Sequence, residues 1–379
     1  MDTVITKRIV LSGYYGFDNS GDEAVLQSIL LALEEQGKAS GIRFVPVVLS
    51  IQPEKTSRTY GVESAHRMRL GEVIRAIRGA DGLISGGGSL LQDATSAKTI
   101  PYYLAILKIA QWLGKPTFVY SQGIGPVHKK MFFGWIRSTF DKSQYISVRD
   151  QESKQLLQRM KVGNEIAVVP DPVMGMPMGS YDVQRVAAAG VDSEVKPVIG
   201  VSVRYWNQDR SELKALAEAL KTVLDNSETV IRFLPFHLPS DAAASAEVRD
   251  HLGEAYRSRI TMADNVVHPQ HMLAEVSQCA VLIGMRLHSL IYAASQAVPM
   301  IGISYDPKID QFLNRLRMTS VATTEAFQAK TVANETLRLL KERDSWREEK
   351  RELIHQLKNE AQFPAKAIAS FYLKAEDSR

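Results

Sequence analysis

A single cysteine, Cys279, occurs among the 379 residues of the chain. The sequence therefore excludes a disulfide framework and a cysteine metal site. No apolar run reaches the roughly 18 residues that a membrane span requires, and the first residues lack the apolar core and cleavage site of a signal peptide. These absences predict a cytoplasmic protein that works in a reducing compartment.

An excess of charge of one sign is also absent. The formal net charge is only +4, which does not indicate a nucleic-acid partner but suits an anionic ligand where positive groups converge. Apolar residues make up 45% and charged residues 23% of the chain, a composition that excludes a disordered or fibrous protein. At roughly 100 to 200 residues per domain, the length predicts two domains or one large one.

Short β-branched runs alternate with segments of helical periodicity along most of the chain. This alternation is typical of an α/β protein with a parallel, doubly wound sheet. The strand-like runs are 9–12, 44–49, 82–85, 117–121, 145–148, 166–169, 198–203, 230–235, 281–283 and 300–304. We therefore expect two tandem Rossmann-like domains with a cleft between them.

Residues 169–180 interrupt this alternation with three prolines, two glycines and no periodicity, which is typical of an inter-domain linker. We expect a first domain at 1–172, a linker at 173–180 and a second domain at 181–360. The remaining residues, 361–379, are expected to form a helix or tail that crosses back to the first domain.

The loop after the first strand enters a helix. Ser20 and Glu23 have the spacing of a capping box, which explains both residues without a ligand. Asp18 and Asn19 are not explained in this way and are candidates to hold sugar hydroxyls. The lysine that a phosphate-binding P-loop requires after Gly21 is absent, which excludes a P-loop nucleotidase.

Glycine turns end two further strands at the same sheet edge. Gly86, Gly87 and Gly88 follow the run 82–85 and let backbone amides approach a bound group, although a tight strand-to-helix turn explains them equally well. Their pattern is not the dinucleotide fingerprint, which argues against an NAD dehydrogenase. Gln122 begins the second turn, QGIGP.

Cations follow four other strands. Arg149, Arg204 and Arg286 each follow a strand-like run, and Lys308 follows the run 300–304. A guanidinium binds carboxylate and phosphate in a planar, bidentate way, whereas any single strand-end arginine is as readily a surface charge. Together the four cations predict a small, highly anionic substrate.

Two histidines lie near these strand ends. His288 is two residues after Arg286, where it can move a proton while the arginine binds an anion. His237 follows another strand, but flanking prolines make loop structure an equal alternative. His268 and His271 have no third ligand at metal-site spacing, so we expect no metal site. The absence of Asp-x-Asp argues against the metal clamp of many sugar-nucleotide transferases.

Five segments in this order resemble the motifs of the polysaccharide pyruvyl transferase family. They read GYYGFDNSGDE, GGG, QGIGP, VRD and MRLH, at residues 13–23, 86–88, 122–126, 148–150 and 285–288. Within the family the chain most resembles the CsaB-type ketal-pyruvyltransferases of Gram-positive bacteria. The resemblance implies a glycosyltransferase B-like fold, with an acceptor-side first domain and a donor-side second domain.

The resemblance also implies an activity and a substrate. Pyruvate from phosphoenolpyruvate, a co-substrate rather than a cofactor, would become a 4,6-ketal with release of phosphate. The acceptor would be N-acetylmannosamine of a lipid-linked secondary cell wall polymer precursor, a step of cell wall biogenesis that later anchors S-layer proteins. In the family the Arg-Leu-His element is associated with the phosphoenolpyruvate site, which carries over onto Arg286 and His288.

Ketal formation needs an acid facing the donor and a base facing the sugar. We expect His288 to be the acid and Asp18 or Asp93 to be the base. Arg286, Arg149, Arg204 and Lys308 would bind the donor, and Asn19, Gly86, Gly87, Gly88, Gln122 and His237 would bind the acceptor. Two alternatives stay open: a sugar-nucleotide-dependent glycosyltransferase or epimerase of the same fold, and a non-catalytic sugar-polymer binding protein.

The segment 129–137, KKMFFGWIR, mixes basic and aromatic residues. Such a segment would dock weakly on anionic lipid and bring a cytoplasmic enzyme to the inner face of the membrane. The alternative is that Phe132, Phe133 and Ile136, at helical spacing, form the buried face of a sheet-packing helix.

Overall fold

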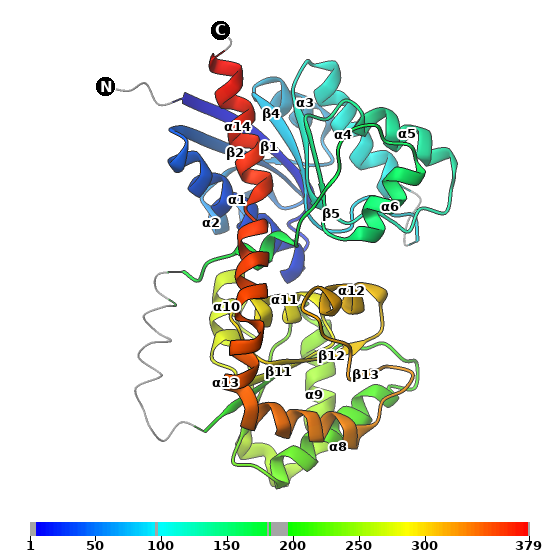
Figure 1. Cartoon of the computed structure of the whole chain (residues 1–379), viewed down its shortest axis with the longest axis vertical. Helices are drawn as coiled ribbons and strands as arrows, with labels where there is room; N and C mark the ends of the chain where they lie inside the picture. Colours follow the sequence, from blue (N-terminus) through cyan, green and yellow to red (C-terminus); the bar gives the residue numbers. More distant parts are fainter. Residues whose placement is uncertain (1–4, 95–97, 180–181, 183–195, 378–379) are drawn as a thin grey trace. The chain divides into compact units, whose positions relative to one another are not determined.

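The computed structural model of the chain describes residues 5–94, 98–179, 182 and 196–377. They form two compact units (Figure 1), the first comprising Met1–Met176 with Leu357–Arg379 and the second Pro177–Gln356. Each unit contains its own parallel sheet. The predicted α/β class with two Rossmann-like sheets is confirmed.

The first unit contains a seven-stranded sheet in the order β3-β2-β1-β4-β5-β6-β7. Its strands are β1 (Ile5–Tyr15), β2 (Ile42–Ser50), β3 (Glu63–His66), β4 (Gly82–Gly86), β5 (Thr117–Gln122), β6 (Tyr145–Val148) and β7 (Ala167–Val168). The central strands β4 and β5 are buried along their whole length, because helices cover both faces of a doubly wound sheet. Their middle residues are apolar, Leu83 and Ile84 in β4 and Phe118 to Tyr120 in β5.

The helices of the first unit follow its strands in turn. They are α1 (Ser20–Ala39), α2 (Pro53–Tyr60), α3 (Leu70–Arg78), α4 (Thr99–Trp112), α5 (Met131–Phe140), α6 (Gln151–Arg159), the 3-10 helix η1 (Pro172–Gly175) and α14 (Phe363–Asp377). From β1 the sheet continues outward to β2 and β3, and from β4 it continues in the opposite direction to β5, β6 and β7. Right-handed crossovers then place α1 and α2 on one face and α4 and α5 on the other.

The second unit repeats the same winding with six strands in the order β10-β9-β8-β11-β12-β13. The strands are β8 (Val198–Ser202), β9 (Val230–Phe233), β10 (Ile260–Met262), β11 (Val281–Gly284), β12 (Met300–Ser304) and β13 (Ala322–Thr323). The helical elements are α8 (Ser211–Asp225), α9 (Ser240–Leu252), η2 (Glu254–Arg259), α10 (Pro269–Ser277), α11 (Leu287–Ser295) and α12 (Pro307–Arg315). Helix α13 (Ala329–Glu360) begins in this unit and ends in the first.

The final helix, α14, belongs to the first unit and packs against α1. The Tyr372 hydroxyl donates a hydrogen bond to the Asp81 carbonyl oxygen at 3.0 Å. The rings of Phe371 and Phe118 meet edge to face, with centroids 5.3 Å apart. The last helix of the chain thus completes the core around the first sheet.

The expected linker, 173–180, has two parts. Its first residues form most of η1, where Val173 and Met174 are buried, as is Met176 directly after η1, and all three belong to the first unit. Ser180, its last residue, is outside the described residues. The change from one unit to the next falls between Met176 and Pro177, and again inside α13 at Gln356.

Candidate functional site

Both sheets have a topological switch point, where successive strands run outward in opposite directions. It lies between β1 and β4 in the first unit and between β8 and β11 in the second. Ligands of open α/β sheets bind outside the carboxyl ends of strands at such points. Predicted site residues follow all four of these strands, and the surroundings of each residue decide what it can do.

Asn19 caps α1. Its backbone is extended, with φ −91° and ψ 105°, and its Oδ1 accepts a hydrogen bond from the Gly21 amide at 3.1 Å. The expected capping box is wrong, because Ser20 is already the first helical residue. The Glu23 carboxylate instead accepts hydrogen bonds from the Gly16 amide at 2.8 Å and the Tyr60 hydroxyl at 2.6 Å.

The two carboxylates predicted to act as the base have other partners. Asp18 forms an exposed ion pair with Lys55 on α2, with Oδ1 and Nζ 2.5 Å apart. Asp93 accepts hydrogen bonds from the backbone amides of His128 and Lys129, at 2.8 and 2.9 Å. Partial desolvation raises the pKa of Asp93, but these backbone bonds outweigh it and hold the pKa below its ordinary value.

The glycine turn after β4 is held closely against α1. Gly87 and Gly88 have φ of +62° and +65°, in the left-handed region that glycine adopts without strain. A Cβ on Gly87 would lie 1.8 Å from Val25 Cγ1, and one on Gly88 would lie 2.8 Å from Asp22 Oδ1. Gly86 ends β4, and its carbonyl oxygen accepts a hydrogen bond from the Tyr15 hydroxyl at 2.9 Å.

Arg149, directly after β6, contacts side chains that follow β4, β6 and β7. Its Nη2 donates to Ser89 Oγ at 2.8 Å, and its guanidinium pairs with Asp171 at 3.5 Å and Asp150 at 3.7 Å. Gln122, at the end of β5, is completely buried. Within the described part of the chain, neither its amide oxygen nor its amide nitrogen has a hydrogen-bond partner.

Asp22 is a site residue that the sequence interpretation missed. It lies in the first turn of α1, partly exposed, beside the Gly88 position. Burial raises the pKa of its carboxyl to about 7, although the positive charge of Arg149 acts in the opposite direction. The signal in the sequence was a third acidic residue in the first-strand loop, beside Asp18 and Glu23, to which no role was assigned from the sequence.

Arg67, after β3, is a second residue that was missed. Its buried guanidinium is surrounded by the rings of Tyr14, Phe17, Tyr102 and Tyr103, at 4.6 to 5.9 Å from their centroids. It donates hydrogen bonds to the Gly13 carbonyl oxygen at 2.7 Å and to the Tyr103 hydroxyl at 3.1 Å. The first-strand loop is therefore fixed by cation–π contacts as well as hydrogen bonds.

Arg286 in the second unit is oriented by a buried carboxylate. Its Nε donates to Asp241 Oδ2 at 2.9 Å, and its Nη2 donates to Oδ1. Asp241 is fully buried and also accepts hydrogen bonds from the amides of Phe236 and His237. The Asp241 carboxylate thus accepts hydrogen bonds from the Arg286 side chain and from the His237 backbone amide. His288 lies in the first turn of α11.

Arg204, after β8, is held among aromatic rings. Its Nη1 donates to the Tyr305 hydroxyl at 2.8 Å, and its guanidinium lies 5.2 Å from the Trp206 ring centroid. Trp206 is 47% exposed, so this cluster reaches the surface. Lys308 lies in the first turn of α12, which follows β12, and its Nζ is 4.0 Å from Asp306 Oδ2.

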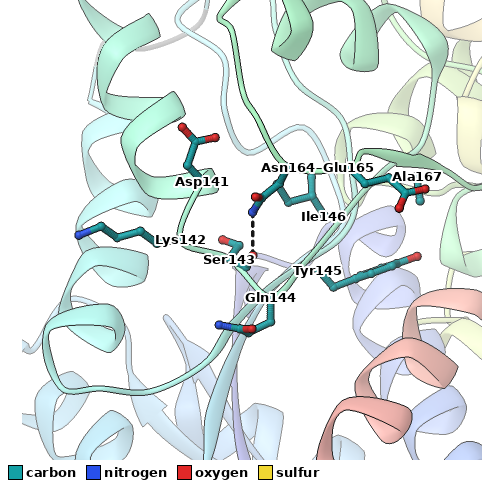
Figure 2. Close-up of a pocket in the computed structure, with 9 residues that line it drawn as sticks. All are labelled: Asp141, Lys142, Ser143, Gln144, Tyr145, Ile146, Asn164, Glu165 and Ala167. Carbon is teal, nitrogen blue, oxygen red and sulfur yellow. Dashed lines mark hydrogen bonds between the residues drawn. The ribbon is translucent and has the colours of Figure 1, made fainter.

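Three other observations delimit the site. In the described ranges, no cluster of three histidine, cysteine or acidic side chains is suited to bind a metal ion. The pocket in Figure 2 surrounds Tyr145, where β6 begins, and Asn164 Nδ2 donates to the Ser143 carbonyl oxygen there at 2.9 Å. This is the amino end of the strand, opposite to the edge where ligands bind.

Solved structures show the same fold at low sequence identity. A putative UDP-N-acetylglucosamine 2-epimerase from Listeria monocytogenes has a TM-score of 0.64 at 13% identity, covering 98% of this chain and 97% of its own. A glycosyltransferase from Rickettsia africae has a TM-score of 0.62 at 12% identity, covering 99% and 98%. The UDP-GlcNAc 2-epimerase from Neisseria meningitidis bound to UDP-GlcNAc has 0.62 at 11%, covering 99% and 100%.

These neighbours establish a glycosyltransferase B-like fold for the chain, and they establish no activity. The sequence profile of a family described as polysaccharide pyruvyl transferase matches residues 19–307. The matched part includes α1 from its cap, the glycine turn after β4, and the Arg-Leu-His element before and within α11. The chain belongs to the polysaccharide pyruvyl transferase family.

Proposed function

We propose that this transferase moves the pyruvate unit of phosphoenolpyruvate onto a sugar as a 4,6-ketal and releases phosphate. The observation that supports this donor is the group of cations at strand ends of the second unit: Arg204, Arg286 and Lys308. Phosphoenolpyruvate carries a carboxylate and a phosphate, and charge-assisted bonds to guanidinium groups stabilise both.

Arg286 is well suited to bind the donor. A guanidinium has five N–H donors, of which Asp241 takes two. The remaining donors are available to an anion because the side chain is 21% exposed. We propose that Arg286, Arg149, Arg204 and Lys308 bind phosphoenolpyruvate and that His288 protonates the methylene carbon of the enol.

We further propose that Asn19, the Gly86–Gly88 turn, Gln122 and His237 bind the sugar. The acceptor is N-acetylmannosamine of a lipid-linked cell wall polymer precursor, and the CsaB-type motifs carry this proposal. We also propose that no cofactor takes part, since phosphoenolpyruvate supplies the pyruvate carbons and the two sugar hydroxyls supply the ketal oxygens.

A lipid-linked acceptor places the enzyme at the inner face of a membrane. No helix in the described part of the chain is long and apolar enough to cross one. Helix α5 buries Phe132 and Ile136, the face expected of a sheet-packing helix, but Met131 is 60% and Trp135 48% exposed. We propose that these two side chains, with the exposed Lys129 and Lys130, give weak peripheral contact with anionic lipid.

A donor comparison tests the proposed function against its two alternatives. Phosphoenolpyruvate and UDP-N-acetylglucosamine are each mixed with the protein and the methyl β-glycoside of N-acetylmannosamine, with glucose and galactose glycosides as further acceptors. The proposal predicts acceptor-dependent phosphate release from phosphoenolpyruvate. Turnover of the sugar nucleotide alone would support a glycosyltransferase or epimerase, and binding without turnover of either would support a sugar-binding protein.

A further inference from the structure

Three aspartates lie near the switch point of the first unit, and they differ in what their carboxylates can accept. Asp18 is exposed and paired with Lys55, and Asp93 is bonded to two backbone amides that keep it ionised. A carboxylate held in either way already has a donor on its oxygens, which a substrate hydroxyl would have to displace. The third aspartate, Asp22, has neither kind of partner.

The position of Asp22 is set by two rigid elements. It lies in the first turn of α1 after the Asn19 cap, and the left-handed Gly88 brings the turn after β4 close to its Oδ1. No hydrogen-bond donor in the described ranges contacts its carboxyl group, although the side chain keeps partial access to solvent. A carboxyl that is close to the switch point, accessible and without a donor is available to a substrate hydroxyl.

Burial and the charges around Asp22 together set the pKa of its carboxyl near neutrality. Burial is the largest influence and raises the pKa to about 7; Arg149 and Arg67 lower it, and Glu23 and Asp171 raise it. The hydroxyls of Tyr15 and Tyr103 also lie within its electrostatic reach. A general base works best when its pKa is near the working pH, and the pKa of Asp22 is shifted toward neutrality whereas that of Asp93 is shifted away from it.

We propose that Asp22 is the catalytic base that accepts the proton of the attacking sugar hydroxyl. This inference rests on the proposed function, and it assigns a role for which Asp18 and Asp93 are the rival candidates. Arg149, one of the proposed donor-binding residues, is the strongest charged neighbour of Asp22. The base therefore lies beside a group that would hold the anionic donor.

The proton balance of the reaction defines what the base does. The first hydroxyl oxygen bonds to C2 of phosphoenolpyruvate as its proton passes to Asp22, and the general acid protonates C3. Phosphate then leaves with the electron pair of its bond to C2, and the second hydroxyl bonds to the same carbon. Of the two hydroxyl protons, one offsets the proton added at C3 and the other leaves with phosphate, so no oxidant or reductant is needed.

The pH dependence of turnover tests the assignment. With phosphoenolpyruvate and the methyl β-glycoside of N-acetylmannosamine both saturating, the wild-type kcat should rise with pH through a midpoint near the Asp22 pKa of about 7. Asp22→Asn should lower kcat by roughly 10²- to 10⁴-fold, abolish that rise and leave the KM for phosphoenolpyruvate unchanged. Asp22→Glu, which keeps a carboxylate, should restore part of both the rate and the rise.

Glu34→Gln is the matched control, because Glu34 is an exposed carboxylate on the same helix; it should keep the wild-type profile. The inference is overturned if Asp22→Asn keeps the rise, or if Asp18→Asn or Asp93→Asn removes it instead. A titration of carbon-13-labelled aspartate, with Asp22→Asn to assign the signal, separates this inference from the proposed function. A carboxyl titrating near neutrality supports the inference even if phosphoenolpyruvate is not the donor, and titration at the ordinary aspartate value contradicts it.

Discussion

At the scale of single residues, Arg286 shows how one side chain can serve the fold and the site together. Asp241, which is 45 residues away in the sequence, holds one edge of the guanidinium. A charge buried as deeply as Asp241 requires a partner, and removing that partner typically costs about 3–5 kcal/mol. The orientation of Arg286 toward the strand end therefore depends on a contact that the local sequence does not reveal.

Arg286→Lys is predicted to fold but to bind phosphoenolpyruvate poorly. A lysine keeps the positive charge for Asp241, but its point charge cannot form the planar fork. A charge-assisted hydrogen bond contributes about 1.5–3 kcal/mol, so the KM for phosphoenolpyruvate should rise roughly 10- to 100-fold. Arg257→Lys, in an exposed ion pair of the same unit, is the control; equal KM values for the two variants would refute the bidentate role.

At the scale of elements, the turn between β4 and α4 is fixed by its fit against α1. The Gly87 position leaves no space for a side chain beside Val25, and its φ is also left-handed. This close fit places Gly88 next to Asp22, so the glycine turn acts on the site through α1. These contacts with α1 support the tight-turn interpretation of Gly87 and Gly88, and acceptor binding by the turn stays a proposal.

Gly87→Ala should destabilise the protein by about 2–4 kcal/mol, the sum of left-handed strain and overpacking against Val25. Gly61→Ala is the matched control, because Gly61 also has a positive φ, +66°, but open space around its Cβ position. That variant should lose only about 1–2 kcal/mol. Urea unfolding measures both values, and equal losses would show that the contact with Val25 does not constrain the turn.

The central elements were predictable from the sequence, and the edge elements and distant contacts were not. Buried strands such as β11 and β12 are nearly continuous apolar runs, a pattern that predicts a strand directly. The sheet-edge strands β3 and β10 and the short β13 escaped prediction because they have only two to four residues and little or no apolar pattern. Asp22 escaped because its environment comes from burial in the folded unit and from the charges of Arg149 and Asp171, which are far away in the sequence.

At the scale of the whole molecule, the same winding occurs twice, and the predicted residues follow the switch-point strands of both sheets. The first unit contains Asp22, Arg149 and the glycine turn, and the second contains Arg204, Arg286 and His288. The proposed division into acceptor and donor units uses this repetition. Met131 and Trp135, the exposed apolar residues of α5, carry the proposed contact with a membrane.

Vesicle sedimentation tests the proposed membrane contact. Wild-type protein should pellet with anionic vesicles at low salt, and Lys129→Glu with Lys130→Glu should not, because each basic residue contributes about 1 kcal/mol near an anionic surface. The double variant Lys196→Glu with Lys214→Glu makes the same charge change at exposed positions of the second unit and should pellet as the wild type does. If all three proteins behave alike, α5 serves only to cover the sheet.

The most direct test of the central claim is phosphate release from phosphoenolpyruvate in the presence of the N-acetylmannosamine glycoside. We predict that release by the wild type depends on the glycoside, matches ketal formation one to one, and falls by roughly 10²- to 10⁴-fold in His288→Ala, as expected for loss of a proton-transfer group. Release that needs no acceptor, or that persists undiminished in His288→Ala, would contradict the account.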